Sequence, residues 1–577
     1  MMEMLRHHRT PWMAVLLCLC MFLGGRAAVA QVDTGALLGT VKDASGAVIP
    51  NAKVTLTNEG TSLTLTATTR GDGSYIFTPL KIGTYTVEAE APGFEKGRNA
   101  GVVVNIQQQV VVDFTLVPGA VTQTVEVTSQ APLLQTQNGS VGQVVNSTAI
   151  NDLPLNGRNF NFLARLTAGV TVGQEEGRSL NSNGWFAANG TRPAQNDLLL
   201  DGIDNNSDNV DFLNGAAYVV KPPVDALSEF KLQTNSFNAE FGRAGGAVLN
   251  ATLKSGSNQI HGDAWEFVRN DKFDAADFFQ DAANESKGEF RQNQFGGTVG
   301  GPIIKNKTFW FADYEGTRIR QATPWLTTVP TAAEASSGFT DFRDLISGQT
   351  GVEGHPDILG RTFSLGTILD PATTRQLNAG QVDPVTGLTA IGSGFVRDQI
   401  QCGGVANTIC ANRLDPNAIK LLQLFPTPTA SSLFSNYSSN PIGSTNVNQF
   451  DVRIDQNFSE KDQLFVRYSF FDSPTFSPGP FTGYADGGGF NNGEQKSRPQ
   501  GAALSWTHSF SPTVINEARI GWTRESVVRT QAYGNDTDNI PGQFGIQGIP
   551  QEVGNGGLPN FEIGGLSQLG SAEWLVS

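Results

Sequence analysis

Apolar and polar residues alternate over short stretches in the C-terminal half of the chain, and this pattern predicts β-strands. It is clearest in residues 450–470, on both sides of a tight turn at 459–462. Because successive side chains of a strand point to opposite faces, each strand would have one apolar and one charged face. The apolar face would carry Phe450, Val452, Ile454, Leu464, Val466, Tyr468 and Phe470, and the opposite face Asp451, Arg453, Asp455, Arg467 and Ser469.

Seven stretches of this kind follow residue 258, and connections of two lengths join them. Short turns at 305–307, 459–462 and 511–513 alternate with much longer connections. Short turns on one side and long loops on the other are typical of transmembrane β-barrels. The predicted strands are 259–269, 291–302, 308–318, 447–458, 462–472, 499–510 and 514–525, and the long connections are 270–290, 319–446 and 473–498.

A soluble β-sandwich also alternates and is the alternative to a barrel; it would be monodisperse without detergent. Charged residues such as Glu517 and Arg519 fall on the predicted inner face, where a wet lumen accepts them and a dry core does not. We therefore predict the first strands of a transmembrane antiparallel barrel. Since barrels that enclose a plug have about 22 strands, we interpret the chain as an N-terminal fragment or a truncated gene product.

Two further units precede these strands. Residues 33–117 contain six or seven short β-branched runs separated by turn signals at about ten-residue spacing, which predicts a β-sandwich. In the next unit, Ser147 can cap a short helix at 148–152, and strands alternate with glycine turns up to residue 257. The predicted fold is mainly β: a sandwich, an α+β unit and an incomplete barrel.

The first thirty residues have the features of a secretory signal peptide. Arg6 and Arg9 lie in a positive region, an apolar run of moderate length follows at 12–23, and residues 28–30 form a small-residue cleavage site. No later stretch has 18 consecutive apolar residues, which argues against membrane-spanning helices. We expect an exported protein.

Composition narrows the classes of partner and of activity. The net charge of −15 argues against binding to nucleic acid, which needs a basic surface. Low charge and abundant glycine suit a protein whose outer face meets lipid. After residue 30 the only histidines are His261, His355 and His508, far apart and without a metal-hydrolase pattern, and we predict that the protein is not an enzyme.

Two cysteines remain after the predicted signal peptide, Cys402 and Cys410, eight positions apart. In an oxidising compartment so short a loop can close as a disulfide, which we predict here. Two free thiols are the alternative.

An acidic, amide-rich loop contains Asp201, Asp204 and Asp208. Oxygen ligands at this density suit Ca²⁺, although the spacing is not that of an EF-hand. A solvated turn is the alternative, and no cofactor other than this calcium ion is expected.

Longer motifs relate the first two units to known families. The order GTVKDASGAVIPNAKVTLTN and TTRGDGSYIFTPLKIGTYTVEAEAPGF resembles the carboxypeptidase regulatory-like domain, a prealbumin-like sandwich related to carbohydrate-binding modules. The stretches LPLNGRNFNFLARLTAGV, NGTRPAQNDLLLDGIDNN and VDALSEFKLQTNSFNAEFGRAGGAVLNATLKSGSN resemble the plug of TonB-dependent receptors. The combination is similar to the Oar-like subgroup of outer-membrane receptor-transporters.

The resemblance implies a division of the chain and a location. Sandwich and plug would face the periplasm of a bacterial outer membrane, and the long loops would be extracellular. The implied domains are a signal peptide (1–30), a regulatory-like sandwich (31–117), a linker (118–146), a plug (147–257) and a barrel part (258–577).

The resemblance also implies partners and site residues. The linker strand Thr124, Val125, Glu126, Val127 and Thr128 would be the TonB box, gripped by a TonB-type periplasmic energy transducer; the alternative is a last sandwich strand or plain linker.

Charged residues of the plug would hold it against the barrel wall, with an ordinary surface ion pair as the alternative. These candidates are Arg158, Glu240 and Arg243.

The implied activity is energised uptake of a ligand that the sequence does not identify; a glycan, a siderophore and a peptide are candidates. The alternative is a non-transporting adhesion or surface glycan-binding protein.

Overall fold

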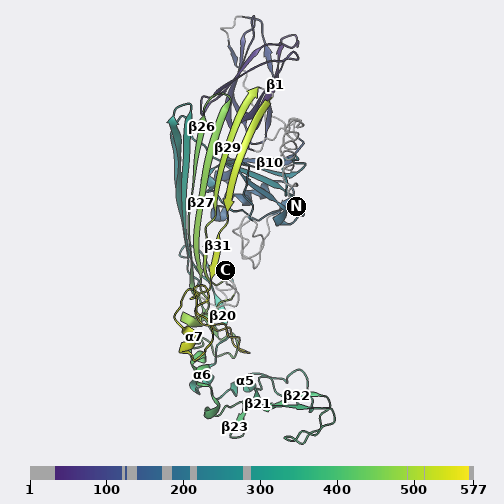
Figure 1. Cartoon of the computed structure of the whole chain (residues 1–577), viewed down its shortest axis with the longest axis vertical. Coiled ribbons are helices and arrows are strands. Elements are labelled where there is room, and N and C mark those ends of the chain that lie inside the picture. Colours follow the sequence, from purple (N-terminus) through teal and green to yellow (C-terminus); the bar gives the residue numbers. More distant parts are fainter. Residues whose placement is uncertain are drawn as a thin grey trace, which may run out of the picture.

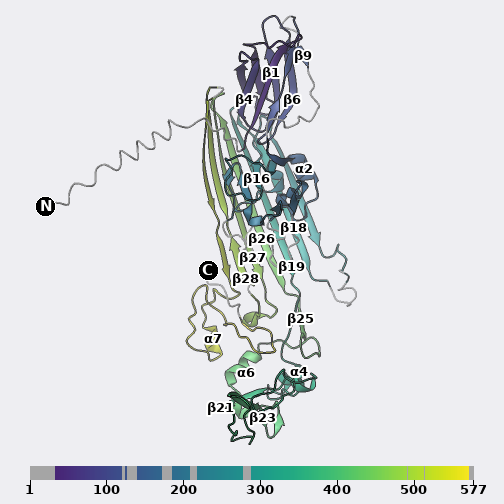
Figure 2. The ribbon, with the colours of Figure 1, turned by 90° about the vertical axis from the view of Figure 1, so that its right-hand side faces the viewer.

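The computed structural model shows an elongated protein built around one long curved sheet (Figures 1 and 2). A small sandwich lies at one end of the sheet, the plug lies against one of its faces, and loop structures extend from the other end. The predicted signal peptide lies outside the described residues. Those residues are 33–119, 124–126, 139–171, 185–207, 218–276, 278, 287–489, 492–511 and 514–570.

The N-terminal sandwich consists of two facing sheets. One has the order β4-β1-β7, with β8 also paired to β1, and the other has the order β3-β2-β5-β6-β9. Leu37, Leu56 and Val87 are fully buried between them, and the hydroxyl of Tyr75 donates to the carbonyl of Val112 at 2.5 Å. The strands are β1 (Gly35–Asp43), β2 (Lys53–Asn58), β3 (Thr64–Thr68), β4 (Ser74–Leu80), β5 (Gly83–Glu90), β6 (Lys96–Val104), β7 (Gln109–Val111), β8 (Phe114–Leu116) and β9 (Thr124–Glu126).

The plug is a five-stranded sheet with short helices on its surface. Its strand order is β10-β15-β16-β13-β14, and Phe230 and Leu227 lie in its apolar core. The strands are β10 (Val141–Asn146), β13 (Asp197–Leu200), β14 (Ile203–Asp204), β15 (Leu227–Asn235) and β16 (Val248–Leu253), with a small pair β11 (Val170–Thr171) and β12 (Ala187–Ala188). The helices are α2 (Ser147–Asp152), η1 (Asn156–Arg158), η2 (Phe160–Leu166), η4 (Pro193–Gln195) and η5 (Val224–Ala226).

The long sheet, which we call the wall, follows the plug. Its order is β17-β18-β19-β26-β27; β27 then pairs with both β28 and β29, which continue to β31 and β30. All seven predicted strand segments lie on wall strands. The wall strands are β17 (His261–Asn270), β18 (Phe290–Ile304), β19 (Thr308–Ala322), β26 (Ile442–Asn457), β27 (Asp462–Ser477), β28 (Gly493–Ser497), β29 (Gln500–Ser511), β30 (Val514–Arg524) and β31 (Val527–Thr530).

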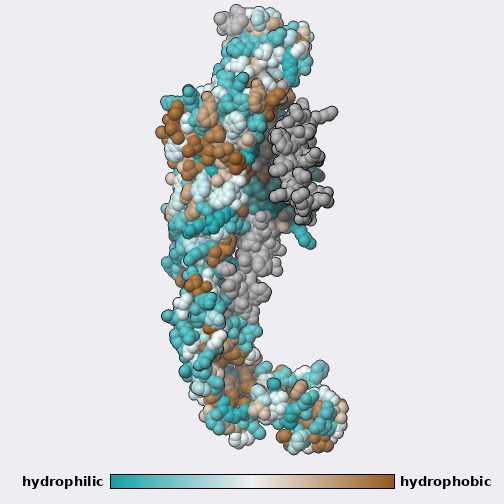
Figure 3. Space-filling view, viewed as in Figure 1, coloured by the Kyte–Doolittle hydropathy of each residue, from teal (hydrophilic) through white to brown (hydrophobic). Residues whose placement is uncertain are grey.

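The two faces of the wall differ as the alternation predicts. On β26, Val452 and Ile454 are exposed, whereas Asp451 and Arg453 are buried beneath the plug. Apolar side chains gather on the outer surface of the wall, above all in the part nearest the sandwich (Figure 3). The predicted fold class is therefore confirmed: mainly β, with sandwich, plug and the antiparallel strands of a barrel that is not closed among the described residues.

The long connection between β19 and β26 folds into structure of its own at the far end of the wall (Figure 1). Here β20 (Trp325–Thr327) pairs with β25 (Tyr437–Ser439), β21 (Leu369–Leu377) with β22 (Gly394–Gln399), and β23 (Gln401–Cys402) with β24 (Val405–Ala406). The helices of the long connections are α4 (Ala332–Ser336), α5 (Asp344–Ser347), η6 (Ala411–Arg413), α6 (Pro416–Leu422), η7 (Gly483–Ala485) and α7 (Ile540–Gln543). No helix among the described residues is long and apolar enough to cross a membrane.

Candidate functional site

The candidate site is the buried interface at which the plug meets the wall, and its centre is Asp201. This residue lies in the tight turn between β13 and β14, with a left-handed backbone (φ 51°), and none of its side chain is exposed. Its backbone N–H donates to the carbonyl of Ala251 at 2.8 Å, and its Oδ1 accepts from the N–H of Leu253 at 3.2 Å. These bonds to β16 direct the carboxylate out of the plug toward the wall.

Two arginines of the wall receive that carboxylate. Arg453 on β26 and Arg467 on β27 are directly opposite each other in the strand register. Nη1 of Arg453 lies 2.9 Å from Oδ1 of Asp201, and Nε of Arg467 lies 2.9 Å from its Oδ2. Like charges opposite each other destabilise a strand pair, so the carboxylate of the plug, together with Asp455 on β26, supplies the negative charge that this pair of wall strands requires.

The arginines have further partners that fix their orientation. Arg453 also pairs with Asp455 on its own strand at 2.9 Å and donates to the plug carbonyl of Leu253 at 3.3 Å. Arg467 donates to Ser469 at 2.7 Å. Because the guanidinium groups are buried, these hydrogen bonds are needed to offset their loss of hydration.

A second plug–wall contact is centred on Arg158. Its guanidinium pairs with Asp225 of the plug and lies 3.5 Å from Glu315 on β19. It also lies over the rings of Phe267 and Trp265 on β17, with 4.5 and 5.3 Å to the ring centroids. A cation held between a carboxylate and aromatic faces is a favourable arrangement, and it connects the plug to β17 and β19, the latter a direct neighbour of the strand that carries Arg453.

Close packing completes the interface at β30. Gly521 lies against Ile203 of the plug, and a Cβ at this glycine would be only 2.3 Å from Cγ2 of Ile203. The absence of a side chain at this position therefore lets β14 approach the wall.

The sandwich also contacts the wall at this end. Nζ of Lys81 lies 3.0 Å from Oδ1 of Asp455, and Arg519 on β30 pairs with Asp33 and Glu517. Between sandwich, plug and wall lies a cavity of about 510 Å³, whose lining includes Tyr85, Lys254, Phe309, Arg453 and Asp455.

Comparison with known proteins agrees with this architecture. Residues 252–575 match the family described as "Outer membrane beta barrel domain". The chain belongs to this family. Residues 36–117 match the carboxypeptidase regulatory-like domain. The chain is thus an outer-membrane protein, and the predicted kinship with Oar-like receptors is confirmed.

Each match to an individual relative covers only part of this chain and only part of the relative. The "TonB-dependent transporter Oar" of Myxococcus xanthus is 27% identical over 317 residues, which are 51% of this chain and 27% of the relative. The chain therefore spans about a quarter of the length of that transporter. Two solved structures are similar at lower identity, the outer-membrane transporter YddB of Escherichia coli and a mutant ferric enterobactin receptor of Pseudomonas aeruginosa.

The structural overlap with these two is limited. YddB is 12% identical, with a TM-score of 0.39, and the match covers 68% of this chain and 40% of YddB. The enterobactin receptor is 10% identical, with a TM-score of 0.37, and the match covers 67% and 41% of the two chains. The relatives named here are a transporter or receptors, and none is described as an enzyme.

The predicted plug-holding residues lie in different places. Arg158 does reach the wall, as described above. The other two make contacts within the plug: Arg243 lies 4.0 Å from Asp204, and Asn238 donates to Glu240 at 3.2 Å. Asp201, which the sequence suggested as a calcium ligand, makes the most buried plug–wall ion pairs among the described residues.

The three residues of the predicted calcium site lie in different surroundings. Both carboxylate oxygens of Asp201 lie 2.9 Å from guanidinium nitrogens of the wall. The side chain of Asp204 is 63% exposed and faces Arg243, and Asp208 lies outside the described residues. Across the described part of the chain, no group of three His, Cys, Asp or Glu side chains is arranged to hold a metal ion.

The predicted TonB box lies at the edge of the sandwich. Thr124, Val125 and Glu126 form β9, which pairs in parallel with Lys96 to Arg98 of β6. This is the position of the alternative prediction, a last sandwich strand. Val127 and Thr128 lie outside the described residues.

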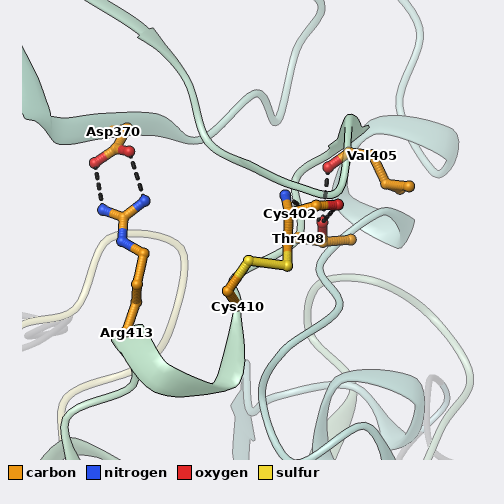
Figure 4. The surroundings of a disulfide bond; sticks show 6 residues. All are labelled: Asp370, Cys402, Val405, Thr408, Cys410 and Arg413. Carbon is orange, nitrogen blue, oxygen red and sulfur yellow. Dashed lines mark hydrogen bonds and ion pairs between the residues drawn. A yellow bond between two sulfur atoms is a disulfide. The ribbon is translucent and has the colours of Figure 1, made fainter.

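The predicted disulfide is present in the structure, in the long β19–β26 connection. Cys402 and Cys410 are bonded with their Cα atoms 5.1 Å apart (Figure 4). Three residues further on, Arg413 forms two hydrogen bonds of 2.7 Å to the carboxylate of Asp370. The disulfide closes the segment 401–413 into a loop, and the ion pair joins this segment to β21 of the β21–β22 hairpin.

Glu229 and Lys231 on β15 hold the sandwich to the plug, and neither was singled out from the sequence. The carboxylate of Glu229 accepts from the backbone N–H of Ile106, and Nζ of Lys231 donates to the carbonyl of Gln107 at 3.0 Å. Burial raises the pKa of Glu229 to about 7 and lowers the pKa of Lys231 to about 8. The sequence feature that could have pointed to these two residues is the presence of two charges within the strand LSEFKLQTN, which is otherwise compatible with burial.

These shifts predict that the contact between sandwich and plug depends on pH. The raised pKa of Glu229 means that the docked state binds its proton more tightly, so docking is most stable below pH 4.5 and weakens as pH rises through 7. Lys231 stays mostly charged over this range, so its contribution to the free energy of docking is nearly constant. We expect the opening equilibrium at 105–108, measured by hydrogen exchange corrected for intrinsic rates, to be at least tenfold smaller at pH 5 than at pH 7.5, since a rise of the pKa from 4.5 to about 7 corresponds to about fiftyfold.

The control for this prediction is Glu229→Gln, which keeps the acceptor and removes the titration. In that variant the opening equilibrium should not change between the two pH values. A wild-type equilibrium that is equally independent of pH would contradict the assignment.

Proposed function

We propose that the protein acts as a TonB-dependent receptor that takes up an extracellular ligand across the outer membrane with energy supplied from the periplasm. The observation that carries this proposal is the insertion of Asp201 of the plug between Arg453 and Arg467 of the wall. The plug is held within the curvature of the wall by ion pairs. Such a plug closes a passage until work is done on it.

The energetics of the interface support a need for an energy source. Separating one partner from a buried ion pair costs about 3–5 kcal/mol, because it leaves a charge buried without compensation. Asp201 has two such pairs and Arg158 adds a third contact with the wall. In the proposed mechanism, ligand binds at the loop end, and a TonB-type protein then pulls on the linker before the plug and moves it.

The segment that we propose the TonB-type protein binds is the strand β9. Among the strands that the structure describes, β9 is at the end of its sheet and pairs with β6, so its other edge can accept a strand from a partner. Strand addition requires a regular ladder of backbone N–H and C=O groups along the outer edge of β9, and a proline within so short a strand disrupts it.

Substitution at Val125 tests this proposal. We expect Val125→Pro to weaken binding of the periplasmic domain of a TonB-type protein by at least about tenfold, since proline cannot donate to a strand ladder. Val125→Thr, which keeps strand propensity and the N–H, is the matched control and should bind like the wild type. Biolayer interferometry on the purified protein in detergent would measure both. Equal binding by the proline variant would exclude β9 as the grip.

A further inference from the structure

The sandwich is bonded to both of the parts that must separate when the plug moves. On the wall side, Lys81 pairs with Asp455, and Asp33 pairs with Arg519. On the plug side, the loop 105–108 bonds to Glu229 and Lys231 of β15. Figure 2 shows the sandwich seated over this end of both wall and plug. A domain attached to two parts at once restrains their relative motion.

The wall contact of the sandwich is also continuous with the central ion pairs of the plug. Lys81 of the sandwich lies 3.0 Å from Asp455, Asp455 lies 2.9 Å from Arg453, and Arg453 lies 2.9 Å from Asp201 of the plug. Four alternating charges thus run from sandwich to plug through two neighbouring side chains of β26. Asp455, Arg453 and Asp201 are almost completely buried, with side-chain exposures of 2, 6 and 0%.

The order of these four charges determines how Lys81 at one end of the row affects Asp201 at the other. Arg453 divides its interaction between Asp455 and Asp201. While Lys81 neutralises part of the charge of Asp455, Arg453 is attracted more strongly to Asp201. When Lys81 leaves, Asp455 has only Arg453 as a partner and draws it away from the plug. In a buried setting the attraction between such charges is strong enough for this competition to matter.

The plug sheet provides a second connection between the two ends. Glu229 and Lys231 lie on β15, β15 pairs with β16, and β16 pairs with β13, which leads directly into Asp201. The N–H of Leu253 on β16 also donates to Asp201. Displacement of β15 by the sandwich would therefore be transmitted to the turn that positions this carboxylate.

We propose that the sandwich is a latch: docked, it strengthens the hold of the wall on the plug, and its release weakens that hold. The latch explains why a separate domain is bonded to wall and plug in one place. It does not depend on which ligand or energy-supplying partner the protein uses.

Hydrogen exchange on the purified, folded protein tests the latch without ligand or partner. In Lys81→Ala we expect the plug peptides that contain β13 and β15 to open about tenfold more readily than in the wild type, the size of coupling seen between residues of one buried network. The matched control is Lys42→Ala, an exposed lysine on β1 of the same sandwich, which should leave plug exchange unchanged.

Exchange in the sandwich core distinguishes release from unfolding. The β1 and β5 peptides should stay protected in Lys81→Ala, because the substitution removes a docking contact and no core side chain. If Lys81→Ala left exchange of the plug at the wild-type rate, or changed it only together with loss of sandwich protection, the latch would be wrong. Such a result would leave the proposed transport function standing, because the plug would still be held by Asp201.

Discussion

Asp201→Asn should destabilise the plug within the wall by about 3–5 kcal/mol, the cost of leaving buried charges without their partner. The asparagine has nearly the shape of the aspartate but no charge, so Arg467 would lose its ion pair with Asp201 and Arg453 would retain its pair with Asp455, while the two guanidinium groups still face each other across β26 and β27. Hydrogen exchange of plug peptides in detergent or in membranes would report the change as faster opening of β13, β15 and β16.

Two variants make this prediction specific. Asp204→Asn removes a carboxylate three residues along the same turn that is 63% exposed and 4.0 Å from its partner, and it should cost less than about 1 kcal/mol. Arg467→Met in the Asp201→Asn background removes one of the stranded charges and should restore part of the loss. Equal effects of the substitutions at 201 and 204 would contradict the role given to Asp201.

The variant Cys402→Ser/Cys410→Ser should destabilise the folded part of the β19–β26 connection by about 2.5 kcal/mol, the chain-entropy value for so short a closed loop. The loss should be local, because the disulfide joins two residues within 401–413, and the Arg413–Asp370 pair joins this segment to the β21–β22 hairpin and not to the wall. Exchange within 366–413 should rise, while exchange within β26 and β27 should remain as in the wild type.

Reduced wild-type protein is the control for the cysteine variant. Treatment with dithiothreitol should reproduce the local change without any substitution, and it should have no effect on the double variant. Titration of two free thiols in protein that was never reduced would show that the bond does not form.

The wall was predictable in detail because its signal is local. The exposure of Val452 and Ile454 and the burial of Asp451 and Arg453 follow from side-chain alternation, which depends only on neighbouring residues. The same holds for the sandwich, whose turns and β-branched runs specify strands without knowledge of their partners. The disulfide was predictable because both cysteines lie in one short loop.

The contacts between units were not predictable in this way. Asp201 and Arg453 are 252 positions apart, and only the docking of plug and wall brings their charges together. In the sequence, Asp201 belonged to an acidic loop with the appearance of a calcium site, and Arg453 was a lumen charge without a partner. Lys81 and Glu229 gave no signal of docking, since each is one charge within a strand or turn. Long-range pairing of this kind is determined by the tertiary arrangement and not by any local pattern.

The opposed arginines of β26 and β27 also have a consequence for biogenesis. These strands are neighbours in the wall, and Asp455 on β26 balances only part of the charge of the two facing cations, so their burial without a further anion would be costly in a low-dielectric setting. The plug is synthesised first, so its carboxylate is already available when the two strands pair. Asp201 would then act as a template that sets the order of assembly, with the plug recruited before the wall around it is complete.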